Sequence, residues 1–247
     1  MRRLAVLALL LATVAACGTD DTSDKTTITV FAAASLKGTF TEIGKQFEAE
    51  HQGVTVRFNF GGSADLEAQL QQGAKADVFA SADTANMLKA IADEVVESKP
   101  ENFASNSLEI ATPPDNPAKI RSLDDLARPS VKVVLCAAEV PCGAVAHDVE
   151  QRSGVDIKPV SEEQSVTDVL GKVTSGEADA GLVYVTDVKA AGDKVHGIPI
   201  PESYGVPTTY PIATLKSGPG LPQEFVDYVT GSRGQAVLSA AGFREPQ

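Results

Sequence analysis

Short apolar runs alternate with amphipathic stretches along most of the chain. In the first third, three runs of strand length are each followed by a stretch whose apolar residues recur at helical spacing. The expected pairs of strand and helix are 28–31 with 36–47, 54–60 with 63–73, and 77–80 with 84–91. Strands that alternate with helices favour a parallel sheet with helices on both faces.

A second series of strands and helices follows a change of order near 102–120. A strand is expected at 107–111, before the proline-rich turn Thr112–Pro117. The later elements predict a second α/β unit and a late return to the first. They are strands at 131–135, 158–160, 180–183, 195–200 and 209–215, and helices at 142–152, 165–174, 222–230 and 233–240.

This order predicts an α/β fold of two lobes with discontinuous domains and two crossover strands, near 104–108 and 204–210. A cleft between two such lobes is a natural place for a ligand. The domains we expect are a signal peptide at 1–16, a flexible tether at 17–26, lobe 1 at 27–105 plus 208–247, and lobe 2 at 106–207.

The N-terminus has the order of charges and apolar residues that is typical of an export signal. Arg2 and Arg3 precede an apolar run that ends in small residues directly before Cys17. The run is shorter than the roughly 20 residues of a transmembrane helix. The segment resembles a bacterial lipoprotein signal, in which the cysteine is lipidated, so we expect a protein anchored to the cell membrane outside the cytoplasm. An ordinary secretory signal with an incidental cysteine is the alternative.

The chain is acidic, with a formal net charge of −12 that becomes −14 once the two arginines of the signal are removed. Such a surface disfavours nucleic acid and anionic lipid headgroups as partners. The absence of tryptophan leaves few residues for stacking on bases or sugars. We therefore expect a small-molecule partner and a monomer, with no nucleic acid.

With Cys17 assigned to lipid, Cys136 and Cys142 form an even pair, six residues apart. In an oxidising compartment a short-range disulfide is one reading, and two buried free thiols are the other. A catalytic thiol is less well supported because no basic residue lies nearby in the sequence. The three histidines are isolated from one another, so no metal site is expected.

Four expected turns from strand to helix carry a small or hydroxyl residue immediately before the helix. Helix N-termini present unpaired backbone N–H groups and a positive dipole end, which suit an anion. For any one turn taken alone, helix capping is the better explanation of the residue, and Ser165 with Asp168 matches a capping box; only the set of four turns favours a ligand. The turns are Ala33–Leu36, Gly61–Ala64, Val140–Gly143 and Ser165–Asp168.

Five separated motifs together resemble the molybdate-binding receptors of bacterial ABC importers. They agree in order and spacing from about Thr27 to Phe243, and they are FAAASL at 31–36, the glycine-serine turn at Ser63, ADVFASAD at 76–83, VPCG at 140–143 and GLVYVTD at 181–187. The resemblance implies a two-lobed periplasmic-binding-protein fold of the second type. It also implies a tetrahedral oxyanion ligand, molybdate or tungstate, without a further cofactor, and delivery to a membrane ABC permease.

The resemblance also implies the ligand contacts. Ser35 and Ser63 would offer hydroxyl and backbone N–H groups, and Tyr184 its hydroxyl, although Tyr184 is also readable as a buried core tyrosine. Cys142 and Val166 would offer backbone N–H groups at helix starts. Cys142 stands where the family often has alanine, a departure that a backbone contact tolerates.

Two other functions stay open from the sequence. One is a receptor for sulfate, phosphate or another small oxyanion. The other is a secreted hydrolase with Cys142 or Ser63 as nucleophile, against which no histidine lies in any of the motifs to act as a base.

Overall fold

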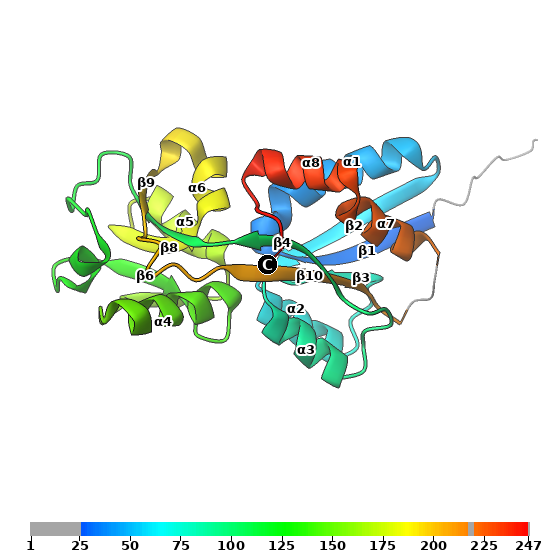
Figure 1. Cartoon of the computed structure of the whole chain (residues 1–247), viewed down its shortest axis with the longest axis horizontal. Coiled ribbons are helices and arrows are strands. Elements are labelled where there is room, and N and C mark those ends of the chain that lie inside the picture. The colour runs from blue at the N-terminus through cyan, green and yellow to red at the C-terminus, as the bar shows by residue number, and fades with distance from the viewer. Residues whose placement is uncertain (1–25, 217–219, 247) are drawn as a thin grey trace, which may run out of the picture.

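The computed structural model describes residues 26–216 and 220–246, so the predicted signal and Cys17 lie outside the described residues. Its strands form two separate five-stranded sheets, each covered by its own helices (Figure 1). We call the two halves lobe 1 and lobe 2. The expected α/β fold is therefore confirmed, with two mixed sheets in place of purely parallel ones.

Lobe 1 is built on the sheet with strand order β2-β1-β3-β10-β4. The first three strands are parallel, and β10 runs antiparallel between β3 and β4. Their bounds are β1 (Thr26–Ala33), β2 (Val54–Gly61), β3 (Val78–Ala80), β4 (Glu101–Asn106) and β10 (Thr208–Thr214).

Helices cover both faces of this sheet because successive side chains of a strand point to opposite faces. Val30 joins an apolar core with Phe40 and Phe225, whereas the next residue, Phe31, joins a second core with Leu66. The helices of lobe 1 are α1 (Lys37–Glu50), α2 (Ser63–Gln71), α3 (Thr84–Ala92), α7 (Leu221–Thr230) and α8 (Ser232–Ala241).

Lobe 2 has the strand order β7-β6-β8-β5-β9, in which β6, β7 and β8 are parallel and β5 is antiparallel to both of its neighbours. Its strands are β5 (Leu108–Thr112), β6 (Val133–Cys136), β7 (Ser161–Glu163), β8 (Ala180–Tyr184) and β9 (His196–Pro199), and its helices are α4 (Pro141–Ser153), α5 (Val166–Thr174) and α6 (Val185–Ala191).

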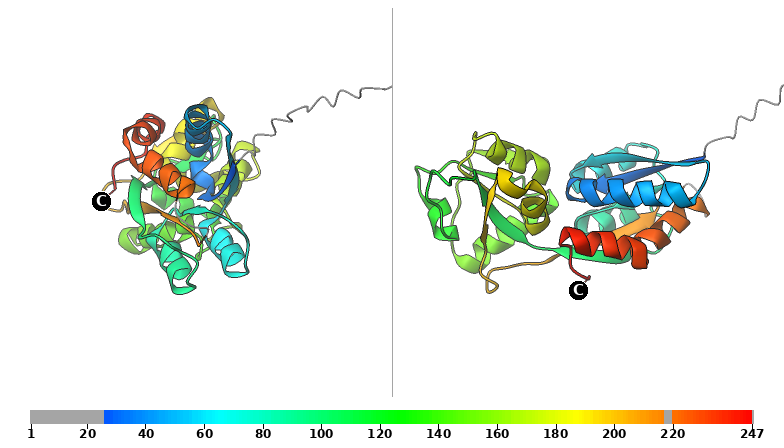
Figure 2. Two further views of the ribbon diagram at one scale, coloured as in Figure 1. Left: turned by 90° about the vertical axis from the view of Figure 1, so that its right-hand side faces the viewer. Right: turned by 90° about the horizontal axis from the view of Figure 1, so that it is seen from above.

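The chain passes between the two sheets twice. Strand β4 leads through Ser107 into β5, and the segment 200–207 leads back from β9 to β10. Seen from above, the two lobes lie side by side and these passages connect them (Figure 2). Thr208 at the start of β10 pairs with Asn106 at the end of β4, so the two passages are neighbours in the lobe 1 sheet.

Three elements differ from the expectations drawn from the sequence. Strand β4 begins earlier than the crossover strand expected near 104–108, and its polar end is buried through long-range hydrogen bonds: Asn106 Nδ2 donates to Thr186 Oγ1 at 2.8 Å. The strand expected at 158–160 lies three residues later, at Ser161–Glu163, and the apolar Val160 that suggested it is 60% exposed. Helix α6 is short and was not expected. None of the described helices is long and apolar enough to span a membrane.

Candidate functional site

A small pocket lies between the lobes, and all five ligand residues expected from the sequence line it. We call it the interlobe pocket. The space open to the centre of a water-sized sphere is about 10 Å³, close to the room that one water needs. Its lining residues are Ala33, Ala34, Ser35, Gly61, Gly62, Ser63, Ala82, Val140, Pro141, Cys142, Val166 and Tyr184.

Ser35 lies in a single 3₁₀ turn that follows β1, at the edge where the parallel strands of lobe 1 end. Its Oγ atom is 3.0 Å from Tyr210 Oη, on β10. The turn shows no side-chain cap. The alternative in which this serine serves only as a helix cap is therefore wrong, because its hydroxyl is engaged with a strand 175 residues away.

Ser63 is the first residue of α2, and the residue in the N-cap position is Gly62. The Ser63 side chain is 1% exposed, and its Oγ accepts a hydrogen bond from the Ala82 backbone N–H at 3.0 Å. The capping alternative is wrong here too. Because the Ser63 oxygen is the acceptor in this hydrogen bond, the O–H of Ser63 is available to donate to a ligand in the pocket.

The lobes touch each other beside Ser63. A Cβ atom added to Gly62 would overlap the carbonyl oxygen of Gln164, in lobe 2, and would lie 3.7 Å from Val140 Cγ1. Gly62 has φ −60° and ψ 139°, which any residue can adopt. Glycine is therefore needed at this position for the close approach of the lobes and not for backbone conformation.

On the lobe 2 side, Cys142 lies in the first turn of α4, next to Pro141 at the helix start. Cys136 and Cys142 form a disulfide with Cα atoms 5.7 Å apart. A Cβ added to Gly143 would overlap the carbonyl oxygen of Ala137. The loop between β6 and α4 is thus tightly folded, and it presents the N-terminus of α4 to the pocket.

Val166 is the first residue of α5, and Ser165 caps this helix. Ser165 Oγ accepts a hydrogen bond from the Asp168 N–H at 3.3 Å, as the capping alternative for this turn predicted. The N–H groups of the first helical residues have no partner within the helix. The Val166 N–H is therefore a candidate donor at the pocket wall.

Tyr184 ends β8, is 1% exposed, and contributes the pocket's one orphaned polar side-chain atom among the described residues. Its Oη atom is buried and makes no hydrogen bond of normal geometry, although the Tyr210 hydroxyl lies close enough to interact with it. Burial raises the pKa of this phenol well above its usual value, so it remains a neutral hydroxyl. A buried hydroxyl without a partner costs about 1–3 kcal/mol, which a ligand that accepts its proton would recover.

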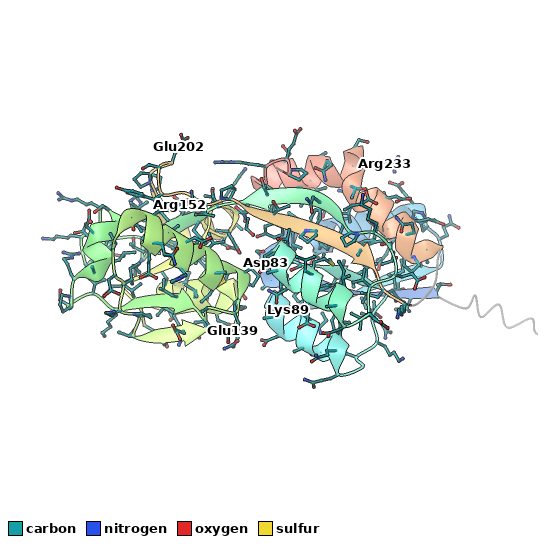
Figure 3. All side chains as sticks on the ribbon, turned by 60° about the horizontal axis from the view of Figure 1, so that its bottom comes forward. Asp83, Lys89, Glu139, Arg152, Glu202 and Arg233 are labelled. Atoms are coloured by element: carbon teal, nitrogen blue, oxygen red, sulfur yellow. A yellow bond between two sulfur atoms is a disulfide. The ribbon has the colours of Figure 1, made fainter. Side chains whose placement is uncertain are left out.

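Two carboxyl groups, one buried and one half-buried, lie near the pocket and were not expected from the sequence. Asp187, on α6, accepts the Tyr184 N–H at 3.0 Å, and burial raises its pKa to about 7. Asp83 caps α3 close to the division between the lobes (Figure 3), and burial raises its pKa as well. Neither residue lines the interlobe pocket. Each is the last residue of one of the quoted motifs, at 76–83 and 181–187, and that place in the motifs is the signal that could have indicated them.

Among the described residues, the interlobe pocket contains no histidine that could act as a catalytic base or bind a metal ion. His51 instead stacks on Phe47, and His147 contacts Gln151. Across 26–216 and 220–246, no group of three or more His, Cys, Asp or Glu side chains could hold a metal ion. The pocket therefore offers uncharged hydrogen-bond donors.

Two α/β lobes that close on a small pocket of donors define the class of two-lobed solute-binding proteins. The sequence profile of bacterial extracellular solute-binding proteins matches residues 28–244, and the chain belongs to that family. It is therefore an extracytoplasmic binding protein, and the fold expected from the motif resemblance is confirmed.

Individual relatives agree with this assignment. The molybdate-binding protein ModA of Mycobacterium tuberculosis is 47% identical over 98% of this chain and 96% of its own length. The substrate-binding domain of a putative molybdenum ABC transporter from Clostridium difficile has a TM-score of 0.67 and 27% identity, covering 90% of this chain and all of the other. The periplasmic molybdate-binding protein of Azotobacter vinelandii, at TM-score 0.75, 24% identity and coverage of 89% and 100%, shares the fold.

Proposed function

We propose that the protein is the molybdate receptor of an ABC importer, with tungstate as a second ligand, and that it delivers the oxyanion to a membrane permease. The observation that carries this proposal is the convergence of Ser35, Ser63, Cys142, Val166 and Tyr184 on one pocket without a charged side chain. The names of the relatives at 47% and 27% identity support the choice of oxyanion.

The donor chemistry suits a dianion. Backbone N–H groups at the starts of α2, α4 and α5 add their dipole ends to the hydroxyls of two serines and a tyrosine. Hydrogen bonds to a charged group contribute about 1.5–3 kcal/mol each. Six or seven of them are sufficient for the roughly 8–12 kcal/mol of micromolar to nanomolar binding, after the costs of desolvation and lobe closure.

Selectivity would come from pocket size and from the lack of an acceptor. Hydrogen phosphate carries a proton that needs a hydrogen-bond acceptor, and none of the lining side chains is a carboxylate. Asp65 and Asp168 lie instead in the first turns of α2 and α5, where they complement the helix dipoles.

Calorimetric titration of the purified protein with molybdate, tungstate, sulfate and hydrogen phosphate tests the proposal. We expect micromolar or tighter binding of molybdate and tungstate and much weaker binding of the other two. Preferential binding of sulfate or hydrogen phosphate would instead establish the alternative oxyanion receptor. If the protein binds none of these anions and instead has a hydrolase activity that Ser63→Ala abolishes, the enzyme alternative is established.

We further propose that Cys17 carries a lipid that anchors a monomeric receptor to the cell membrane, on the pattern of charges and apolar residues before it. In cells, Cys17→Ala should move the protein to the soluble fraction or block its maturation. The variant should still bind molybdate, because Cys17 precedes the first strand of the fold, which begins at Thr26. Normal cleavage with unchanged membrane retention would contradict lipidation at this residue.

A further inference from the structure

The two serine hydroxyls of the pocket are both hydrogen-bonded to other residues of lobe 1. For Ser63 the direction is certain, because the Ala82 N–H can only donate. For Ser35 the partner is the hydroxyl of Tyr210, 3.0 Å away, and either oxygen is able to donate. The direction of this second bond decides whether Ser35 has a proton left for a ligand.

Tyr210 lies behind the pocket and not in its wall. It is fully buried on β10, and the rings of Phe103, Tyr184 and Phe243 pack around it at centroid distances of 6.2, 6.1 and 5.4 Å. Burial raises the pKa of its phenol well above the usual value, so the hydroxyl keeps its proton. The aromatic packing holds the ring in one orientation, with its oxygen 3.0 Å from Ser35 Oγ. The side chains of Asn106 and Tyr184 also lie close enough to interact with this hydroxyl.

We propose that Tyr210 is a positioning residue that donates its hydroxyl proton to Ser35 Oγ and so directs the Ser35 proton into the interlobe pocket. The inference rests on the proposed function, since it needs an anion in the pocket. A phenol is more acidic than an aliphatic alcohol and is the better donor of the two. The Ser35 proton gains most by pointing at an anion, because hydrogen bonds to a charged acceptor are about twice as strong as neutral ones.

Strand β10 supports the second serine in a similar way. Thr208 Oγ1 donates to the Ala82 carbonyl oxygen at 2.6 Å, and the N–H of the same residue, Ala82, bonds Ser63. Strand β10, which follows the return passage from lobe 2, thus contacts Ser35 through Tyr210 and the support of Ser63 through Thr208. We infer that it keeps both serine hydroxyls oriented as hydrogen-bond donors.

The arrangement has a consequence for specificity. With its oxygen engaged by Tyr210, Ser35 has less capacity to accept a proton from a ligand. A protonated oxyanion such as hydrogen phosphate therefore finds donors at Ser35 and Ser63 and no matching acceptor. Tyr210 would then favour a fully ionised oxyanion without touching it.

Tyr210→Phe tests this assignment, because it keeps the ring and removes only the hydroxyl. We expect molybdate affinity to fall roughly five- to tenfold, the effect of one weakened hydrogen bond. Affinity for hydrogen phosphate should fall less, so the preference for molybdate over hydrogen phosphate should become smaller. Tyr228→Phe is the matched control, because it removes a hydroxyl that bonds Glu50 at the surface and should leave both affinities unchanged.

Double variants separate positioning from a general structural effect. If Tyr210 acts through Ser35, adding Tyr210→Phe to Ser35→Ala should cause no further loss of molybdate affinity. Added to Ser63→Ala, Tyr210→Phe should lower molybdate affinity by the same factor as it does in the unmodified protein. Equal losses in both backgrounds, or unchanged affinity in Tyr210→Phe, would overturn the inference while leaving the proposed function intact.

Replacement of Tyr210 by 4-aminophenylalanine gives a second test of hydrogen-bond donation by residue 210, one that does not depend on how well Tyr210→Phe folds. The aromatic amine retains a donor at the same place, so molybdate affinity should lie closer to that of the unmodified protein than to that of Ser35→Ala. An affinity as low as that of Ser35→Ala would contradict donation by residue 210. If the unmodified protein binds no molybdate, the proposed function itself is wrong, and this inference with it.

Discussion

The two walls of the interlobe pocket obtain their donors in different ways. In lobe 1, the donors include the side chains of Ser35 and Ser63, which are held by hydrogen bonds to residues distant in sequence. In lobe 2, the candidate donors at Cys142 and Val166 are backbone groups, held by a disulfide and a capped helix within a few residues. Truncating a serine side chain should therefore harm the lobe 1 wall, whereas at Cys142 and Val166 in lobe 2 only a change to the backbone should weaken binding.

The largest effect is expected from a change that keeps the two walls apart. Gly62→Ala places a methyl group where the Gln164 carbonyl lies, so the lobes cannot approach as they do now. A ligand that needs the closed form binds more weakly as that form becomes rarer, and we expect a loss of molybdate affinity of about 100-fold. Gly171→Ala is the matched control, because nothing lies within 4 Å of the added atom. Calorimetry that shows equal affinities for the two variants would contradict contact between the lobes in the bound form.

The next effect distinguishes backbone from side chain in lobe 2. Val166→Pro removes one N–H donor, whereas Val166→Ala keeps it. Proline is tolerated at a helix start, and the extended Ser165, with φ −149° and ψ 156°, suits a residue before proline. We expect Val166→Pro to lose about 1.5–3 kcal/mol of molybdate binding free energy and Val166→Ala to lose little. Calorimetric losses of equal size would place the contact in the side chain instead.

Tyr184 is the one lobe 2 residue with a side-chain donor in the pocket, and it sharpens the comparison. Tyr184→Phe should weaken molybdate binding by about 1–3 kcal/mol. It should leave the unfolding temperature of the ligand-free protein unchanged or higher, because it removes a buried hydroxyl that makes no hydrogen bond of normal geometry. Thermal unfolding with and without molybdate measures both effects, and a destabilised ligand-free protein with normal affinity would show that the hydroxyl has a structural role.

The smallest effect on molybdate binding is expected at Asp187, which lies three residues after Tyr184, does not line the interlobe pocket and acts on stability instead. Its pKa in the folded protein is about 7, above the 3.8 of an unburied carboxyl, so the folded state holds this proton more tightly than the unfolded state. The stabilising contribution of the protonated group is complete below pH 3.8 and is lost as the pH rises through about 7. Relative to Asp187→Asn, the native protein should lose stability between these values. Denaturant unfolding at several pH values that shows parallel curves for the two proteins would refute the raised pKa.

The parts of the fold that follow from periodicity were predictable from the sequence, and those that depend on distant partners were not. Strand β1 and helix α1 follow from apolar spacing, because their side chains are buried by neighbouring segments. Strand β4 buries Ser105 and Asn106, whose burial depends on partners 140 and 80 residues away. No local pattern reveals such partners.

The candidate site divides in the same way. The motifs placed Ser35, Ser63 and Tyr184 in one pocket, since each lies at a turn that ends a strand. They did not indicate Tyr210, which lies in an ordinary apolar strand and becomes relevant only through its hydroxyl bond to Ser35. Nor did they indicate that Gly62 contacts the other lobe, because its neighbour Gln164 lies in lobe 2, about 100 residues later in the chain.

The central claim is that an oxyanion binds between a lobe 1 wall that needs two serine hydroxyls and a lobe 2 wall whose donors at Cys142 and Val166 are backbone N–H groups. Calorimetric titration of molybdate into Ser35→Ala/Ser63→Ala, with Cys136→Ala/Cys142→Ala beside it, tests this claim most directly. We predict that the serine variant loses at least about 2 kcal/mol of binding free energy. The cysteine variant, which keeps every backbone N–H group, should lose less than the serine variant. Full affinity in the serine variant would contradict the claim and place the anion elsewhere.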